Sequence, residues 1–143
     1  MSDIIIREPD DAEYEVVRKY IDEFWLDKAY MHKGQFRILL FNGAIAAFAR
    51  IKKHRSCTEL CTLGVVKKLR GRHIGMVIVN GILAGIKKEV YIVTVIPDYF
   101  RKIGFHFAKE FPVIIRKKLD NCRNNYSVGE TYRVMKWGKS RVS

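Results

Sequence analysis

The sequence contains few of the features that cross-link, anchor or divide a chain. Only three of its 143 residues are proline and three are cysteine. No run approaches the ~18 consecutive apolar residues that a membrane-spanning helix needs, and the acidic start of the chain is unlike a secretory signal peptide. We therefore expect neither membrane insertion nor secretion. Repeats, low-complexity tracts and Pro/Gly/Ser-rich linkers are also missing, so we expect residues 1–143 to form one domain, with a frayed tail at 140–143.

The cysteines and histidines predict neither disulfides nor a metal site. An odd number of cysteines without a secretion signal argues against a disulfide framework and favours the reducing cytoplasm. Cys57 and Cys61 lie four residues apart in a strand-like segment, where they would share a face rather than surround an ion. The histidines have no ligand spacing, so we expect surface or loop positions for His32, His54, His73 and His106.

The charge is strongly positive and unevenly placed. The 27 lysines and arginines outnumber the 15 acidic residues, which gives a net charge of +12 at pH 7. Residues 1–31 carry 4 basic and 9 acidic side chains, residues 32–100 carry 12 and 3, and residues 101–143 carry 11 and 3. Such a field attracts nucleic acid, an acidic membrane surface, a phosphate-rich cofactor or an anionic substrate. Charge alone leaves these alternatives open.

Hydrophobic patterning predicts a mixed α/β domain that begins with antiparallel strands. A β-branched run at 4–6 predicts a strand, and Asp10 or Asp11 can cap a helix after it. Runs at 36–41 and 44–51 are joined by Asn42-Gly43, a dipeptide typical of a type I′ hairpin turn. The apolar members of the first helix are expected to be Val16, Val17, Tyr20 and Ile21.

The rest of the chain predicts a strand-helix-strand unit followed by shorter elements. A strand at 58–66, a helix from Gly75 to Lys88 and an apolar strand at 90–96 form the unit, with the last strand as a central parallel partner. Gly81 and Gly85 share one face of that helix, where a neighbouring backbone could approach closely. The later elements are a helix at 98–103 started by Pro97 and stopped by Gly104, a strand at 105–107, a helix at 111–119 and a strand at 131–137.

A basic loop, Lys67-Lys68-Leu69-Arg70-Gly71-Arg72-His73, precedes the middle helix. Backbone N–H groups at a helix N-terminus and the positive end of the helix dipole form an anion site, to which the lysines and arginines add charge. The loop lacks both the Gly-Lys-Ser/Thr ending of a Walker loop and the three-glycine dinucleotide pattern. The local pattern therefore leaves open a pyrophosphate site or a solvated basic loop.

Two motifs, in order, resemble the signatures of the GNAT N-acyltransferases. Leu63 to Gly75 resembles the acetyl-CoA-binding motif, which has Gln or Arg, two free positions, Gly, one free position, and Gly or Ala. Arg70 and Gly75 match its first and last members, and His73 stands where the family has glycine. Pro97 to Phe105 resembles the second signature, an aromatic pair followed by a Gly-Phe ending. The resemblance covers nearly the whole chain.

The resemblance implies an α+β fold with a mixed central sheet of six to seven strands and helices on both faces. It also implies an acyltransferase with acetyl-CoA as co-substrate, in which the backbone N–H of Leu63 holds the carbonyl oxygen as it becomes negative. A tyrosine of the second signature protonates the departing thiolate in many relatives. That position here is Phe100; the adjacent Tyr99 is the remaining candidate, although neighbouring helical residues diverge by about 100°, which favours packing. The implied cofactor-binding residues are Val65, Val66, Lys67, Arg70, Gly71, Arg72, His73, Ile74, Gly75, Thr94 and Phe100.

Glu59 is the candidate general base. It lies six residues before Val65 and so on the same strand face. Burial in an apolar strand raises the pKa of a carboxyl group, which could then take a proton from an ammonium through a water. Several branches of the family have a catalytic glutamate at this position; the alternative is a rim carboxylate paired with a lysine. Cys61 shares the face, but no histidine is placed to activate it, so we expect a small core residue.

Within the superfamily, the chain most resembles the acetyltransferase domain of the N-acetylglutamate synthases. This implies an amino-acid N-acetyltransferase whose acceptor is L-glutamate or another small amine. Arg37 and Arg50 are candidates for holding an acceptor carboxylate, because arginine makes bidentate pairs with carboxylates. A protein or peptide N-acetyltransferase and a basic nucleic-acid-binding module are the alternatives. We expect a homodimer from base rates. The matching runs are Glu59-Leu, Val93-Thr-Val, Tyr99-Phe100, Phe111-Pro, Arg116-Lys-Lys and Cys122-Arg-Asn-Asn.

Overall fold

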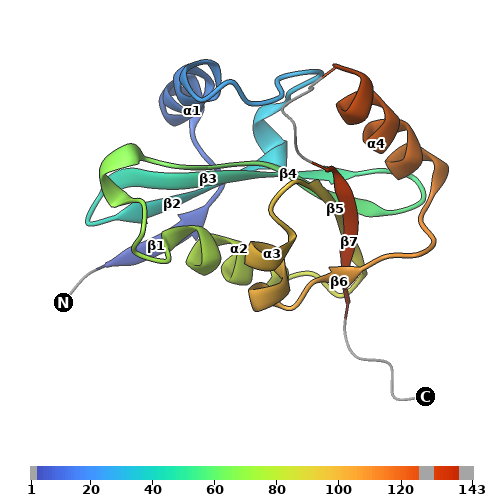
Figure 1. Cartoon of the computed structure of the whole chain (residues 1–143). Coiled ribbons are helices and arrows are strands. Elements are labelled where there is room, and N and C mark those ends of the chain that lie inside the picture. Colours follow the sequence, from blue (N-terminus) through green and yellow to red (C-terminus); the bar gives the residue numbers. More distant parts are fainter. Residues whose placement is uncertain (1–2, 126–130, 139–143) are drawn as a thin grey trace. The chain divides into compact units, whose positions relative to one another are not determined.

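The computed structural model describes residues 3–125 and 131–138. Its strands form one mixed sheet in the order β1-β2-β3-β4-β5-β7-β6, with α-helices between them, so the predicted α/β class is confirmed (Figure 1). The expected tail at 140–143 lies outside the described residues. The elements are β1 (Ile4–Arg7), α1 (Asp11–Glu23), β2 (Phe36–Phe41), β3 (Ala44–Lys53), β4 (Thr58–Val65), α2 (Ile74–Ala84), β5 (Val90–Thr94), α3 (Pro97–Ile103), β6 (His106–Phe107), α4 (Val113–Asn125) and β7 (Arg133–Trp137).

The contacts divide the chain into two compact units. The first contains the described residues of 1–51 and 61–85, and the second contains those of 52–60 and 86–143. Strands β3 and β4 each contribute residues to both units. The single domain expected from the sequence stays a prediction.

The predicted hairpin is present in the first unit. β2 pairs antiparallel with β1 and β3, and its register with β3 runs from Phe36↔Arg50 to Phe41↔Ala44. Asn42 and Gly43 between the strands have φ values of 50° and 84°. A type I′ turn requires positive φ at both of its central residues, and Asn-Gly accepts this conformation at low cost. The hairpin is therefore confirmed.

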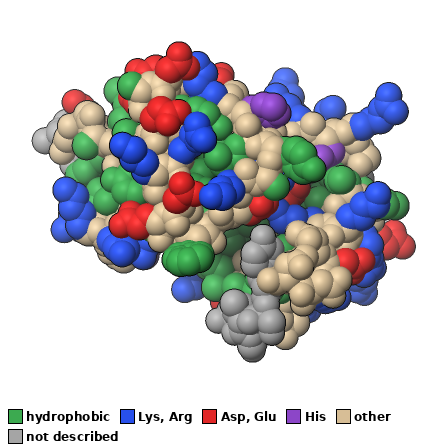
Figure 2. All heavy atoms as spheres, turned by 90° about the horizontal axis from the view of Figure 1, so that it is seen from above, with side chains coloured by type: hydrophobic (Ala, Val, Ile, Leu, Met, Phe, Trp, Pro, Cys, Tyr) green, Lys and Arg blue, Asp and Glu red, His purple; other side chains and the backbone are tan. Residues whose placement is uncertain are grey.

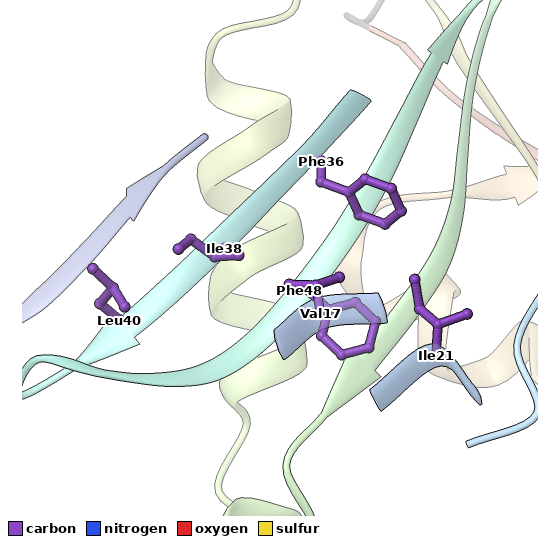
Figure 3. Close-up of a cluster of buried hydrophobic side chains, with 6 residues drawn as sticks. All are labelled: Val17, Ile21, Phe36, Ile38, Leu40 and Phe48. Atoms are coloured by element: carbon purple, nitrogen blue, oxygen red, sulfur yellow. The ribbon is translucent and has the colours of Figure 1, made fainter. Parts of the chain in front are cut away.

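Helix α1 covers one face of this hairpin. It begins at a capping box, in which the Glu13 N–H donates to Asp10 Oδ1 at 2.7 Å and the Asp10 N–H donates to Glu13 Oε1 at 2.9 Å. Such a cap is worth about 1 kcal/mol. Val16, expected on the apolar face, is 39% exposed. Figure 3 shows the buried cluster beneath the helix, formed by Val17, Ile21, Phe36, Ile38, Leu40 and Phe48.

Helix α2 lies on the other side of the strands and contacts β1 and β2 (Figure 1). The predicted close approach of a backbone is not found: an added Cβ on Gly81 would overlap the side chain of Ile6 on β1, and one on Gly85 would meet only the Ile82 carbonyl oxygen. The predicted end at Lys88 is wrong, because the helix ends at Ala84 with Gly85 as its C-cap. Glycine is a poor helix former, and the exposed Lys87 and Lys88 offer no apolar face to continue the helix.

The second unit is built around β5. This strand pairs parallel with β4 at Thr58↔Val90 and Glu59↔Tyr91 and antiparallel with β7, which also pairs with β6. The predicted parallel partner is confirmed. The predicted end of the strand at residue 96 is wrong, because the backbone turns after Thr94, whose Oγ1 accepts from the Ile96 N–H at 3.0 Å.

The ends of the later helices differ in one case from the prediction. Helix α3 begins at Pro97 and is followed by Gly104 with φ 122°, as expected. Helix α4 was predicted over 111–119, but it begins at Val113 and extends to Asn125, because Cys122 continues the buried face one turn beyond Leu119. The core beneath it contains Tyr91, Ile115, Leu119 and Val134. None of the helices in the described part of the chain is long and apolar enough to cross a membrane.

Candidate active site

A turn after β4 leads directly into helix α2 in the first unit. A 3-10 turn covers Lys67–Leu69, and its Arg70 N–H donates to the Lys67 carbonyl. Gly71 and His73 then have positive φ values of 83° and 62°, and His73 is the N-cap of α2. The local sequence produces this path because Gly71 accepts the left-handed conformation without a steric cost.

This turn leaves the N-terminus of α2 available to an anion. The first N–H groups of any α-helix lack partners inside the helix, and the His73 side chain makes no capping hydrogen bond to them. Lys67, Lys68 and Arg72 are exposed around the turn. A Cβ built on Gly71 would meet no atom within 4 Å, so the space beside its backbone is open. These features fit a pyrophosphate group.

Arg70 has a structural part in this turn. Its Nε donates to the Val65 carbonyl at 2.9 Å, and its guanidinium carbon lies 4.7 Å from the centre of the Phe24 ring. These contacts connect the end of β4 and the end of α1 to the turn. Binding of a phosphate by Arg70 stays a prediction.

His73 occupies the position at which the GNAT motif has glycine. Its left-handed φ of 62° explains why glycine suits the position, since a side chain there costs roughly 1–2 kcal/mol. The sequence departs from the motif, whereas the backbone takes the conformation that the motif favours.

Glu59 lies in a polar cluster in the second unit. Its Oε1 is 2.8 Å from Nε2 of His54, and its Oε2 is 3.4 Å from Nζ of Lys118 on α4. The Lys118 contact is an ion pair without hydrogen-bond geometry, since Oε2 has no hydrogen-bond partner. The Glu59 side chain is 3% exposed and the His54 side chain 22% exposed. Glu59 is therefore buried in β4 and paired with a lysine and a histidine, and its role as a base stays a prediction.

The local geometry explains how His54 reaches Glu59. The His54 N–H donates to the Cys57 carbonyl at 2.8 Å, which closes the turn between β3 and β4. This turn places two residues five positions apart side by side. His54 lies in the loop between β3 and β4, as expected, and is in addition a partner of the candidate base.

Thr62 lies within β4, between Glu59 and Leu63, and has an unusual backbone conformation. Its φ of 52° is an outlier for a β-branched residue, and a left-handed residue within a strand is typical of a bulge. The peptide group that carries the Leu63 N–H follows this residue directly. Strict alternation of faces does not continue through such a residue, so the argument that Glu59 and Val65 share a face loses its basis. Strained backbone of this kind is common in active sites.

The residues of the second signature are mostly buried. Phe100 is 3% exposed and packs edge-on against both Tyr99 and Phe105. Burial raises the pKa of the Tyr99 phenol above its usual value, so this side chain keeps its proton at neutral pH. Thr94 is also buried, with its hydroxyl oxygen bonded to the Ile96 N–H. Roles for these residues toward a cofactor stay predictions.

The two arginines proposed to hold an acceptor carboxylate contact the main chain instead. Arg50 is fully buried, with Nε donating to Gln35 Oε1 and one terminal nitrogen donating to the Ala29 and Tyr30 carbonyls. Its other terminal nitrogen is buried without a hydrogen-bond partner. Arg37 donates to the carbonyls of residues 34 and 36. Direct contact of Arg50 with an acceptor is thus not supported, because solvent does not reach its guanidinium.

The three cysteines form no disulfide bond. Burial raises the pKa of the Cys57 thiol, and the nearby Glu59 carboxylate adds to this effect. A raised pKa lowers the fraction of reactive thiolate. Among the residues that the structure describes, no group of three His, Cys, Asp or Glu side chains could hold a metal ion.

Sequence reasoning missed three residues of this region. His54 could have been found from a tight turn at 54–57, because short turns bring flanking side chains together. Lys118 is on α4, 59 positions from Glu59, and no local pattern connects the two. The left-handed Thr62 has no signal in the sequence, since threonine is a common residue in regular strands.

Solved structures of known proteins share this fold. N-acetylglutamate synthase of Neisseria gonorrhoeae, complexed with coenzyme A and N-acetyl-glutamate, matches with a TM-score of 0.76 and 18% identity over 97% of this chain. Rv2747 of Mycobacterium tuberculosis, in complex with CoA, matches with a TM-score of 0.72 and 16% identity over 95% of this chain and 99% of that one. Naa50 of Arabidopsis thaliana, in complex with the bisubstrate analogue CoA-Ac-MVNAL, matches with a TM-score of 0.64 and 17% identity over 96% of this chain and 99% of that one.

These structures confirm the GNAT acetyltransferase fold that the motifs implied. The chain spans about a third of the N-acetylglutamate synthase, since 36% of that chain is covered. No family model matches the sequence, and no curated protein matches it. The identities are all below 20%, so the likeness is one of fold.

Proposed function

We propose that this protein is an acetyl-CoA-dependent N-acetyltransferase that moves an acetyl group to the amine of a small acceptor. The observation that carries the proposal is the turn between β4 and α2, with its uncapped helix N-terminus, exposed cations and open space beside Gly71. The shared fold supports it, because the similar structures include an N-acetylglutamate synthase complexed with coenzyme A and Naa50 in complex with a CoA-containing bisubstrate analogue.

The turn binds the pyrophosphate of acetyl-CoA, which supplies an acetyl group activated as a thioester. The N–H groups at the start of α2 donate to the phosphate oxygens, and Lys67, Lys68 and Arg72 neutralise their charge. The strained Thr62 turns the following peptide group, so that the Leu63 N–H donates to the acetyl carbonyl oxygen as it gains negative charge.

Glu59 accepts the proton from the acceptor amine through water, because its own side chain is buried. A carboxylate can do this only if it is ionised before the reaction, and Lys118 places a positive charge 3.4 Å from Oε2. Burial of Glu59 keeps bulk water from competing for the carboxylate. The departing thiolate takes its proton from solvent or from Tyr99, whose phenol is protonated at neutral pH.

The acceptor we favour is a small amine that bears a carboxylate, such as L-glutamate or another amino acid. The net charge of +12 attracts such an anion, and Figure 2 shows lysine and arginine side chains spread over the face that it draws. The complex of the similar Neisseria synthase with N-acetyl-glutamate supports the same class. Arg50 contributes by holding the main chain at Ala29 and Tyr30, rather than by direct contact.

A peptide N-terminus is the second candidate acceptor. The Trp25 and Tyr30 side chains, 93% and 90% exposed, offer an apolar surface that a small polar amine does not need. The fold likeness to Naa50, which was solved with a peptide bisubstrate analogue, supports this alternative. The homodimer and the cytoplasmic location expected from the sequence stay predictions.

The test mixes the protein with acetyl-CoA and, in separate reactions, L-glutamate, other amino acids, a polyamine and a short peptide. Released CoA is measured by chromatography, because a thiol dye would react with the three cysteines. We expect CoA release that requires one class of amine, with the acetylated product identified by mass spectrometry. No release above the enzyme-free rate with any amine would refute the proposal.

A matched pair of variants tests the cofactor site separately. K67M/K68M removes two charges from the turn, whereas K87M/K88M removes two exposed charges beyond α2. We expect the first pair to weaken CoA binding about tenfold or more by calorimetry, and the second to leave it near wild type, because only the first lies near the phosphates. Equal effects would indicate non-specific attraction to a basic surface.

A further inference from the structure

His54 joins buried Glu59 to solvent. Its Nε2 lies 2.8 Å from Glu59 Oε1, which is hydrogen-bond distance, and its side chain is 22% exposed against 3% for Glu59. The His54 ring is thus the part of the pair that solvent reaches. A neutral imidazole accepts a proton at one nitrogen and releases one from the other, so it can pass protons without changing its own charge over a full cycle.

Glu59 needs such an outlet if it acts as the base. In each acetyl transfer, a C–N bond forms, the C–S bond of the thioester breaks, and a proton leaves the nitrogen. If that proton remained on Glu59, the carboxyl group could not serve in the next cycle. Lys118, the other group against the carboxylate, is an ammonium that has no acceptor site for the proton.

We propose that His54 is a proton relay, and therefore a positioning residue that acts through Glu59. This inference rests on the proposed acetyltransferase function. With the ring proton on Nδ1, the proton moves from the amine to Oε1 of Glu59 and then to Nε2 of His54, while Nδ1 releases its proton to solvent. Exchange of the ring protons with water then restores the Nδ1–H tautomer, so that Nε2 can accept again. The thiolate of CoA is protonated separately, so each cycle returns Glu59 to a carboxylate and His54 to a neutral ring.

The charged and titratable groups around the pair limit which group can accept the proton from Glu59. Lys118 faces Glu59 from α4, Cys57 lies in the turn with His54, and Tyr91 is opposite Glu59 in the β4–β5 register. Burial raises the pKa of the Cys57 thiol, and an uncharged thiol is a poor acceptor for a proton. Among these described groups, His54 is the base at hydrogen-bond distance from the carboxylate.

The first experiment compares His54→Gln with the wild type and with His106→Gln. Glutamine can donate to Glu59 but cannot titrate, and His106 is an exposed histidine on β6 that makes a matched control. We expect His54→Gln to lower kcat/KM about tenfold and to remove one ionisation from its pH profile, while CoA binding and thermal unfolding stay near wild type. His106→Gln is expected to keep the wild-type profile. Wild-type kcat/KM and pH profile in His54→Gln would overturn the relay.

Chemical rescue separates a relay from a merely structural contact. In His54→Ala, added imidazole is expected to restore kcat/KM in proportion to its free-base concentration, and a failure of rescue in a folded variant would contradict the relay. An NMR titration of the His54 ring, in the wild type and in Glu59→Gln, distinguishes the two proposals. A titration midpoint that differs between the wild type and Glu59→Gln supports the coupled pair, even if no amine is acetylated. If the protein transfers acetyl to none of the amines, the proposed function and the relay are both overturned.

Discussion

The buried guanidinium of Arg50 donates a hydrogen bond of 2.8 Å to the main-chain carbonyl of Tyr30. The same nitrogen donates to the Ala29 carbonyl, and Nε donates to Gln35. Arg50 therefore holds the segment between α1 and β2 from beneath. The segment needs this support because Tyr30 has a left-handed φ of 55° and a side chain that is 90% exposed.

The substitution Arg50→Met is expected to lower the free energy of unfolding by about 3 kcal/mol. Methionine keeps much of the apolar stem but loses three charge-assisted hydrogen bonds. Urea unfolding followed by circular dichroism measures the change. Arg37→Met is the control, and we expect a loss below about 1 kcal/mol, because its carbonyl partners lie nearer to solvent. Equal stability of Arg50→Met and wild type would contradict this role.

His73→Gly is expected to stabilise the fold by about 0.5–1 kcal/mol. Glycine removes the cost of a side chain at φ 62°, which outweighs the extra entropy that glycine gives the unfolded chain. Gly71→Ala makes the opposite change at a second left-handed residue, since it adds a side chain at φ 83°, where the new Cβ meets nothing within 4 Å. We therefore expect Gly71→Ala to lower the free energy of unfolding by about 1 kcal/mol through the backbone conformation alone. Thermal unfolding of both variants checks the pair, and a destabilised His73→Gly would show that the imidazole itself supports the turn.

Gly64→Ala is expected to destabilise the protein by about 1–3 kcal/mol. A methyl group at this position of β4 would overlap the ring of Phe48, which is fully buried on β3. Gly85→Ala is the matched control, since its Cβ would lie 3.7 Å from the nearest atom, the Ile82 carbonyl oxygen. The control should be neutral or slightly stabilising in the same unfolding assay. A tolerated Gly64→Ala would show that Phe48 can move without cost.

The N-terminus of α1 should make stability dependent on acidic pH. The Arg7 guanidinium, at 2.7 Å, and the Asp10 N–H both hold the pKa of Glu13 below its usual value. A carboxyl pKa that is lower in the folded state stabilises the fold above the unfolded pKa, and this contribution disappears as pH falls through the folded value. Urea unfolding at pH 7 and at pH 3 should show a smaller difference in Glu13→Gln than in the wild type. An unchanged difference would contradict the assignment.

Local signals in the sequence predicted much of the fold. The Asn42-Gly43 turn was predictable because its conformation depends on two adjacent residues, and the Pro97 start and Gly104 stop of α3 depend on equally local preferences. The end of α4 was not predicted, because it depends on Cys122 packing into a core made by distant strands. Helix ends follow tertiary burial more than local propensity.

The candidate site was predictable only in part. Spacing and resemblance indicated Glu59 and the turn at 67–73, since both depend on order along the chain. The surroundings of Glu59 depend on α4 and on a turn, so its contacts with Lys118 and His54 were not predictable from residue spacing. Arg50 was expected to face an acceptor, but the alternation of side chains along β3 does not indicate which face of the strand is covered.

The most direct test of the account is the rate of acetyl transfer by Glu59→Gln. Glutamine is close in shape to glutamate but cannot accept the proton of the amine. With the amine identified by product analysis, we predict a fall in kcat/KM of about 10²–10⁴, the usual contribution of a general base. CoA affinity should stay near wild type, because the phosphate-binding turn is unchanged. A Glu59→Gln protein that binds CoA and transfers acetyl at the wild-type rate would contradict the assignment of Glu59 as the base.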